Sequence, residues 1–447
     1  MIARTCRLPV LLSTAAPGTL VLTLCRPIGL LLANAIHFVQ CQTMRQPTKP
    51  LRLAEFVTLL ALMVAILAMA TDIMLPALDT IGRDLDVADP NDAQLVVSSL
   101  FVGFAVGQLL VGPLADSFGR KPVIYAGYVI FISGCLLSMF ATSFAMMLFG
   151  RVLQGLGAAG PRIISISIVR DGYEGRAMAR IMSIIMAVFI LVPAVAPAMG
   201  QGVMLLAGWR STFAMPLLLA IIAFAWFAAR QPETLAPDAR RAFSLANIAS
   251  AIAEACSDRV VIGYTIATGL IFGAFLGYLS SAQQIFTVTF GKGPQFPLYF
   301  AVAAIAIGAA SVMNSMLVMR LGMRLLTYRA LVGISVISAV FLVPTALAQG
   351  VPPLWLFMTW LLVIFFCTGI LFGNLNALAM EPLGHMAGLG AALVGSIATF
   401  ISLPLGWLVG NTFDGGVSSL VAGFAVFGCA AIAVMRWVER MAPFAVR

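Results

Sequence analysis

The chain has 447 residues, of which 61% are hydrophobic and only 10% are charged, and its mean hydropathy is +1.04. A soluble protein of this length could not keep such a composition in water, so the sequence predicts an integral membrane protein. The net charge of +9 does not indicate nucleic-acid binding, because no soluble basic surface is predicted. Seven cysteines without a C-x-x-C pair and only two histidines predict no disulfide framework, no metal site and no cofactor.

Residues 1–50 do not fit a membrane span. Arg4 and Arg7 precede two short apolar runs. A cleaved signal peptide has no use before a helix whose start stays inside, and a thirteenth helix would carry both arginines outside. We therefore expect residues 1–50 to be an N-terminal extension, with a native start at Met44 and a preceding segment that is disordered or a start-site artefact.

Apolar windows predict an all-α membrane protein with twelve transmembrane helices. The windows lie at about 55–78, 93–115, 122–142, 145–168, 178–205, 210–229, 259–283, 297–318, 326–347, 354–379, 386–410 and 417–436. A polar linker at 231–258, with a predicted amphipathic helix, separates a six-helix bundle at 51–230 from a second one at 259–447. The Lys and Arg residues of the loops gather on one side, with only Arg83, Arg210 and Lys292 on the other. This asymmetry predicts that both ends of the core lie in the cytoplasm. The expected location is the cell inner membrane.

The first span contains Asp72 in the stretch MATDIMLPAL, residues 69–78. An ionised carboxylate at the centre of a bilayer costs roughly 2.5–3.5 kcal/mol, so it persists when it is paired, protonated or in contact with water. With 1.5 Å per residue, Asp72 lies about 24 Å along the first helix, and Arg151 lies about 9 Å from the outer face on the fourth. In a core of roughly 30 Å, the two residues are within about 3 Å of the same depth. They are the predicted partners.

The loop after the second span reads GPLADSFGRK, residues 112–121. It resembles the loop signature G-x-L-a-D-r-x-G-r-[kr] of the major facilitator superfamily. Gly112 would let the second helix approach its neighbour, Asp116 would face a helix N-terminus or a cation, and Gly119 would make a tight turn. The other residues of this predicted conformational latch are Arg120, Lys121, Arg170 and Asp171. The alternative is that these charges only set the topology.

The resemblance implies two pseudo-symmetric six-helix bundles with the substrate between them, and transport by alternating access. The fourth span carries GRVLQGLGAAG, residues 150–160, which is similar to the motif R-x-x-Q-G-x-G-a-a of proton-coupled members. Arg151 and Gln154 share a helix face. A carboxylate near this arginine could bind and release a proton as its surroundings change; the alternative is a buried pair that only fixes helix packing.

The fifth span contains LVPAVAPAMGQ, residues 191–201, which resembles the G-x-x-x-G-P-x-x-G-G signature of drug/proton antiporters. Pro197 and Gly200 match the signature and Pro193 adds a second proline, whereas three expected glycines are replaced. With the other motifs, this resembles the bicyclomycin/chloramphenicol-resistance branch of twelve-helix drug/proton antiporters.

The resemblance implies proton-coupled export of drugs or other small amphipathic molecules by a monomer. Its expected partners are a small-molecule substrate, protons and the lipid bilayer. The candidate cavity residues are Gln108, Gln154, Arg162, Tyr264, Asn314 and Asn374. Arg162 could contact an electronegative group of the substrate or merely face water. A uniporter or importer of a small metabolite would share the fold, and a response to protonophore would distinguish it. No enzyme is indicated, because the sequence has no nucleophile–His pair, paired carboxylates or phosphate loop.

Overall fold

The computed structural model describes residues 51–240 and 242–440, so the expected extension at 1–50 lies outside the described residues. The described chain forms twelve spans that are long and apolar enough to cross a membrane, as predicted. The α-helices are α2 (Leu53–Asp72), α3 (Leu78–Asp84), α4 (Leu95–Phe118), α5 (Arg120–Met139), α6 (Phe144–Gly172), α7 (Gly175–Ala207), α8 (Ser211–Arg230), α9 (Leu245–Ser257), α10 (Arg259–Gln284), α11 (Phe296–Leu321), α12 (Met323–Leu347), α13 (Leu354–Met380), α14 (Ala387–Asn411) and α15 (Ser418–Glu439).

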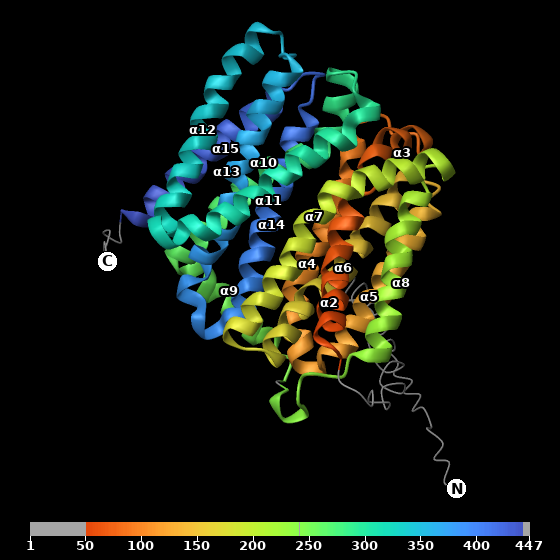
Figure 1. The fold of residues 1–447 in the computed structure, drawn as a ribbon, viewed down its shortest axis with the longest axis vertical. Helices are drawn as coiled ribbons and strands as arrows, with labels where there is room; N and C mark the ends of the chain where they lie inside the picture. Colours follow the sequence, from red (N-terminus) through yellow and green to blue (C-terminus); the bar gives the residue numbers. More distant parts are fainter. Residues whose placement is uncertain (1–50, 241, 441–447) are drawn as a thin grey trace, which may run out of the picture. The chain divides into compact units, whose positions relative to one another are not determined.

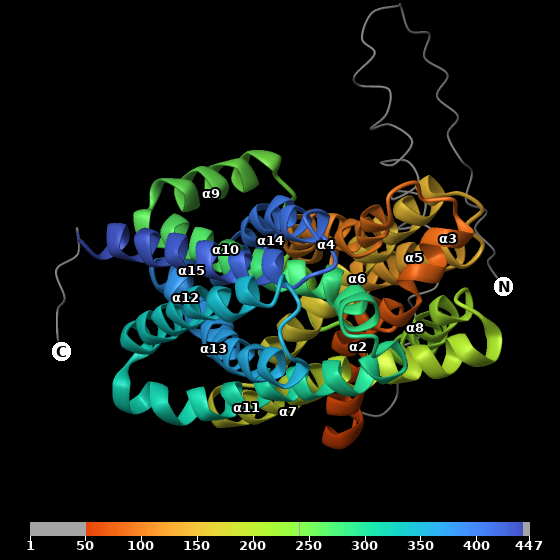
Figure 2. The same cartoon turned by 90° about the horizontal axis from the view of Figure 1, so that it is seen from above.

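Helices α2 to α8 form the first half of the structure, and α10 to α15 form the second half (Figure 1). Within the first half α6 packs against α4 and α5, and within the second half α10 packs against α14 and α15. The halves meet along two seams, α4 with α14 and α7 with α11, which are visible from above in Figure 2. A site between the halves is therefore bordered by α4 and α7 on one side.

The two ends of the helices differ in the connections they carry. The end with the connections after α4, α6, α8, α11 and α13 is called the basic end, and the other is called the opposite end. The linker between the halves contains α9, in which Ile248, Ala251 and Ala255 are buried. Their spacing of three and four residues places them on one helical face, which packs against α10 and α14. The linker thus contains a helix with one buried face.

The first span is interrupted inside the membrane region. Helix α2 ends at Asp72, and a 3-10 segment, η1 (Leu75–Ala77), precedes α3. Pro76 explains the interruption, because proline has no N–H to donate to the carbonyl of the residue four before it, and its ring crowds that carbonyl. The residue four before Pro76 is Asp72. The sequence therefore places a carboxylate and a helix end at the same point.

Glycines allow the helices of the first half to approach closely. A Cβ atom on Gly155 of α6 would overlap the carbonyl oxygen of Leu100 of α4, and one on Gly157 would overlap the backbone of Phe131 of α5. Small residues at such contacts bring membrane helices together. The expectation that Gly112 has this role is wrong, because a Cβ atom there would meet nothing within 4 Å. On α4 the close contacts with α6 are made by Gly103 and Gly107.

Candidate functional site

The charged centre of the first half lies where α2 is interrupted. Asp72 is buried, with 4% of its surface exposed, and Arg151 of α6 is completely buried. Arg151 donates from Nη1 to the carbonyl of Ala70 at 2.9 Å and from Nε to the carbonyl of Val96 at 2.9 Å. Ala70 is in the last turn of α2, where carbonyls lack partners within the helix and a cation is favoured. Arg151 therefore caps the interrupted end of α2.

Asp72 and Arg151 do not form an ion pair in the part of the chain that the structure describes, although the guanidinium binds a carbonyl two residues before Asp72. The two charges are close enough to interact electrostatically. Among the described residues, Nη2 of Arg151 has no hydrogen-bond partner, and the Asp72 carboxylate accepts no hydrogen bond. No hydrogen bond from a described residue therefore holds the Asp72 carboxylate, although the Arg151 guanidinium lies within electrostatic range.

Gln154 holds Arg151 in place. Its Oε1 accepts a 2.6 Å hydrogen bond from Nη1 of Arg151, and its Nε2 donates to the carbonyl of Gly134 at 3.2 Å and to Oγ of Ser138 at 3.0 Å. The shared helix face of Arg151 and Gln154 is as predicted. Since the amide has partners on both sides and is fully buried, Gln154 in this structure positions Arg151 and offers no free group to a ligand.

Helix α7 contacts the same point of the first span. A Cβ atom on Gly200 would overlap the carbonyl oxygen of Ile73, the residue after Asp72. Pro193 and Pro197 lie inside α7, which continues as one helix past both. Gly200 is therefore required for α7 to pack against the interruption, whereas the two prolines end no helix here.

The second half contributes Tyr278 of α10 to the surroundings of Asp72. The Tyr278 ring packs edge-on against Phe365, with 4.7 Å between centroids, and stacks on Phe300. Its buried hydroxyl has no hydrogen-bond partner among the described residues, and it lies within electrostatic range of Asp72. No local sequence pattern links Tyr278 to Asp72, because 206 residues separate them, 278 minus 72.

Two of the other candidate cavity residues pair with each other. Asn314 of α11 and Asn374 of α13 exchange hydrogen bonds of 3.0 and 2.9 Å between their amides. Tyr264 of α10 lies at the basic end, where its hydroxyl is 3.3 Å from the carboxylate of Glu439. The structure thus places these three residues apart from Asp72.

The remaining two candidates lie near the seams. Gln108 of α4 approaches Gly395 of α14, where a Cβ atom on the glycine would meet Oε1 of the glutamine at 2.5 Å. Arg162 of α6 lies against two aromatic rings, Phe104 of α4 and Phe189 of α7. Of the six residues predicted to contact substrate, only Gln108 and Arg162 are thus placed near the contact between the halves, and the other four form hydrogen bonds within one half.

Amide side chains join the two halves at the opposite end. Nε2 of Gln94 donates to Oε1 of Gln284 at 2.7 Å and to the carbonyl of Gly410 at 3.1 Å. Asn91 donates to the carbonyl of Phe413 at 3.1 Å, and Gln283 donates to Asp79 at 3.1 Å. The sequence analysis did not find these contacts, since uncharged amides near helix ends have no distinctive spacing.

The latch residues meet at the basic end of the first half. Arg120 forms ion pairs with Asp116 at 2.6 Å and with Asp171 at 3.2 Å. Gly119 has a φ of +101°, which favours glycine. The sequence analysis missed Glu233 in the linker. Its carboxylate accepts hydrogen bonds of 2.9 Å from the backbone N–H groups of Arg120 and Lys121 at the start of α5.

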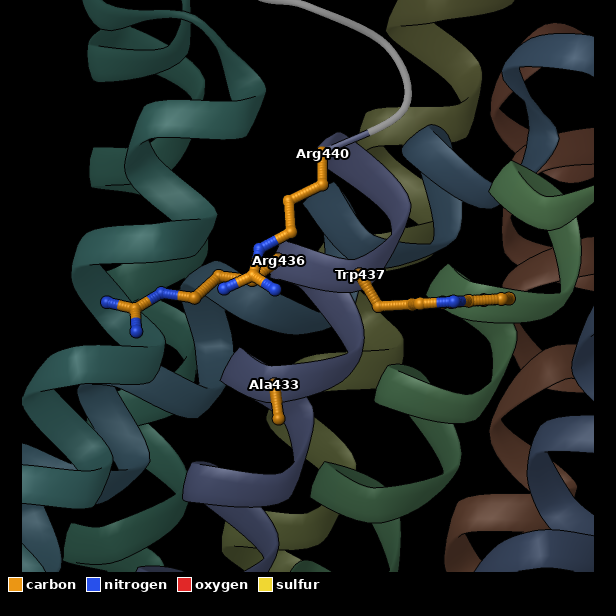
Figure 3. A pocket seen from close by; sticks show the side chains of 4 residues that line it. All are labelled: Ala433, Arg436, Trp437 and Arg440. Carbon is orange, nitrogen blue, oxygen red and sulfur yellow. The ribbon is translucent and has the colours of Figure 1, made fainter.

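Arg170, the remaining latch residue, is exposed and forms no ion pair with the described residues. A separate pocket lies at the basic end of α15 and is lined by Ala433, Arg436, Trp437 and Arg440 (Figure 3). Nη2 of Arg436 donates to the hydroxyl of Tyr328 at 2.7 Å. This pocket contains none of the residues around Asp72.

Comparisons with known proteins agree with this architecture. Residues 60–406 match the model of the family described as Major Facilitator Superfamily. The chain is 28% identical over 386 residues to the bicyclomycin resistance protein homolog of Haemophilus influenzae, covering 86% of this chain and 95% of that protein. It is 26% identical over 356 residues to multidrug resistance protein D of Escherichia coli strain K12, covering 77% and 86%.

Among solved structures, a D-xylose-proton symporter matches with a TM-score of 0.68 at 14% sequence identity. The match covers 87% of this chain and 98% of the symporter. At this identity the likeness shows the fold alone.

Proposed function

The chain belongs to the Major Facilitator Superfamily, and on that premise we propose that it exports drugs or other small amphipathic molecules in exchange for protons. The names of the two drug-resistance relatives support a drug as substrate. In our proposal the protein lies in the cell inner membrane, and the distribution of Lys and Arg supports an orientation with both ends of the core and the basic end in the cytoplasm.

The observation that carries the proposal is the buried, unpartnered carboxylate of Asp72 at the interruption of α2. A carboxylate at the C-terminal end of a helix faces its negative end, and burial disfavours its charge, so both effects favour a proton on Asp72. The positive charge of Arg151 acts in the other direction. A small movement of α2, α6 or Tyr278 would change this balance, and with it the proton occupancy.

Alternating access would supply that movement. In our proposal the two halves rock about the α4–α14 and α7–α11 seams, and Asp72 is exposed to one side of the membrane at a time. A proton taken up from outside is released inside, and a substrate leaves in the other direction. The ion pairs of Arg120 with Asp116 and Asp171, and the Glu233 carboxylate at the start of α5, would stabilise one of these states.

Everted membrane vesicles with an acidified lumen test the exchange. A fluorescent ΔpH probe such as ACMA reports loss of protons from the lumen when bicyclomycin, chloramphenicol or ethidium is added. We expect dequenching with at least one of these compounds, and no dequenching for Asp72→Asn at equal expression. Asp86→Asn is the matched control, because Asp86 is exposed and has a φ of 51°, which asparagine tolerates well.

Undiminished dequenching by Asp72→Asn would contradict the role of Asp72. Accumulation of drug in the vesicles that protonophore leaves unchanged would indicate a uniporter, and would contradict proton exchange itself.

A further inference from the structure

Arg162 is a second arginine in the interior of α6. It follows Arg151 by eleven residues, which at 100° per residue returns to within about 20° of the same face, about 16 Å further along the helix. Its guanidinium carbon lies 4.3 Å from the ring centroid of Phe189 on α7 and 5.8 Å from that of Phe104 on α4. Because α4 and α7 are the helices that form the seams, Arg162 lies on the side of the first half that meets the second half.

Among the residues that the structure describes, none accepts a hydrogen bond from Arg162. Its Nη1 is buried and has no partner among the described residues, and no described carboxylate forms an ion pair with it. The guanidinium carbon lies over both rings, which attract the positive charge but offer no oxygen or nitrogen acceptor to its N–H groups. A buried N–H group without an acceptor is costly, so an acceptor from outside the chain would be favoured here.

The charges of the span interiors point to an anion. Three charged side chains lie at least seven residues from both ends of a described span, namely Asp72, Arg151 and Arg162. Their sum is +1 when Asp72 is ionised and +2 when it is protonated. Charge in a low-dielectric interior is costly, and a bound ligand with one negative charge would lower this excess.

Aromatic side chains next to Arg162 indicate the shape of the ligand. Phe101, one turn before Phe104 on α4, packs edge-on against Phe272 of α10 across the halves, with 5.6 Å between centroids. Phe272 in turn contacts Phe275 and Phe372 of the second half. A flat apolar body could stack beside these rings, while a carboxylate matches the planar fork of the guanidinium.

From these observations we propose that Arg162 is the anchoring residue for organic monoanions that carry a carboxylate on an aromatic or apolar body. The inference rests on the proposed export function and names one substrate class for it. The carboxylate accepts hydrogen bonds from Arg162, and the apolar body lies between Phe104 and Phe189 of the first half and the phenylalanines of the second.

A matched pair of probes tests the anchor without requiring transport. The purified protein in neutral phosphatidylcholine nanodiscs is titrated calorimetrically with 2-naphthoate and with 2-naphthamide, which share the ring system and differ in charge. We expect the wild type to bind naphthoate at least about tenfold more tightly than naphthamide, as charge-assisted hydrogen bonds allow. Arg162→Gln should remove this preference and retain naphthamide binding, which shows that the variant is folded.

Arg162→Lys keeps the positive charge but loses the planar set of N–H donors. Its preference for naphthoate should therefore fall between those of the wild type and Arg162→Gln. Arg83→Gln is the control, because Arg83 is exposed and bonds only to the carbonyl of Asp79 in its own helix. Equal affinities of the wild type for both probes, or an unchanged preference in Arg162→Gln or Arg162→Lys, would overturn the inference. If Arg162→Gln is not recovered folded, Arg162→Lys decides.

Two further arms separate the alternatives. If phosphatidylglycerol in the nanodisc abolishes naphthoate binding to the wild type, the acceptor is a lipid headgroup and the proposed substrate class is wrong. Asp72→Asn should lose the proton response of the vesicle assay and keep the naphthoate preference. If the wild type shows the proton response in vesicles but no preference for naphthoate over naphthamide, this inference alone is contradicted. If it shows the naphthoate preference but no proton response, proton exchange alone is contradicted.

Discussion

The two ends of the helix bundle are held together by different kinds of contact. At the basic end the ion pairs lie within single halves: Arg120 with Asp116 and Asp171 and Arg230 with Glu55 in the first, and Arg324 with Glu381 in the second. At the opposite end, uncharged amides such as Gln94 and Gln284 join the two halves.

The difference indicates which contacts would separate if the two halves move as proposed. Net contributions of neutral hydrogen bonds are about 0.5–1.5 kcal/mol each, so a few amide bonds between the halves can form and separate in every cycle. Charged pairs at the basic end tie the helices of one half to each other and need not separate when the halves move. The opposite end is thus the closed end in this structure, because amide hydrogen bonds join the halves there.

The largest effect is expected from disturbing the turn that organises the basic end. Gly119→Ala places a side chain at a φ of +101° and within 2.7 Å of the Glu233 carboxylate. The free energy of unfolding should therefore fall by about 1–3 kcal/mol, and the transport rate should fall at least about tenfold. The same substitution at Gly112, inside α4 with nothing within 4 Å, should raise the free energy of unfolding by about 0.5–1 kcal/mol. Thermal unfolding in detergent and vesicle transport measure both. Equal effects of the two substitutions would contradict the role of the turn.

A smaller effect is expected from weakening the closed end. Gln94→Ala removes the hydrogen bonds to Gln284 and Gly410, which should shift the equilibrium between the two states by about five- to thirtyfold toward opening. In a background without other cysteines, a single cysteine at Ser98, now buried, should react faster with a membrane-impermeant maleimide. Gln295→Ala at the same end is the control, because Gln295 bonds only within its own half, to Tyr299. Equal labelling rates in both variants would show that the amides do not close this end.

The smallest effect is expected from the exposed ion pair of the second half. Arg324 and Glu381 are 3.2 Å apart with about half of each side chain exposed, and such pairs contribute about 0–1 kcal/mol. Arg324→Gln should therefore leave the thermal midpoint within about 1 °C and transport within about twofold. A loss as large as that of Gly119→Ala would mean that the second half has its own latch.

The sequence was sufficient for features with local causes. Twelve apolar windows predicted the spans, and the loop motif predicted the charged cluster around Arg120, because its members are close in the chain or at adjacent helix ends. Spacing also predicted that Arg151 and Gln154 share a face. Even the interruption of α2 has a local cause, since Pro76 follows Asp72 by four residues.

The rest of the candidate site depends on contacts that leave no pattern in the sequence. Arg151 binds backbone carbonyls of α2 and α4, and any residue type supplies a carbonyl. Glu233 belongs to a linker whose path along the bundle is set by tertiary packing. Gln94 and Gln284 are 190 residues apart. The similar depths of Arg151 and Asp72 in the membrane predicted that the two residues lie near each other. They could not show that the Arg151 guanidinium would donate a hydrogen bond to the carbonyl of Ala70.

Proton release from the purified protein tests the central claim most directly. In weakly buffered detergent solution with a pH indicator, addition of a transported drug should release protons from the wild type, up to about one per molecule at a pH where Asp72 is protonated. The Asp72→Asn variant should bind the same drug and release none, whereas Asp86→Asn should behave like the wild type. Equal proton release by Asp72→Asn would contradict the account, because the exchanged proton would then reside on another group.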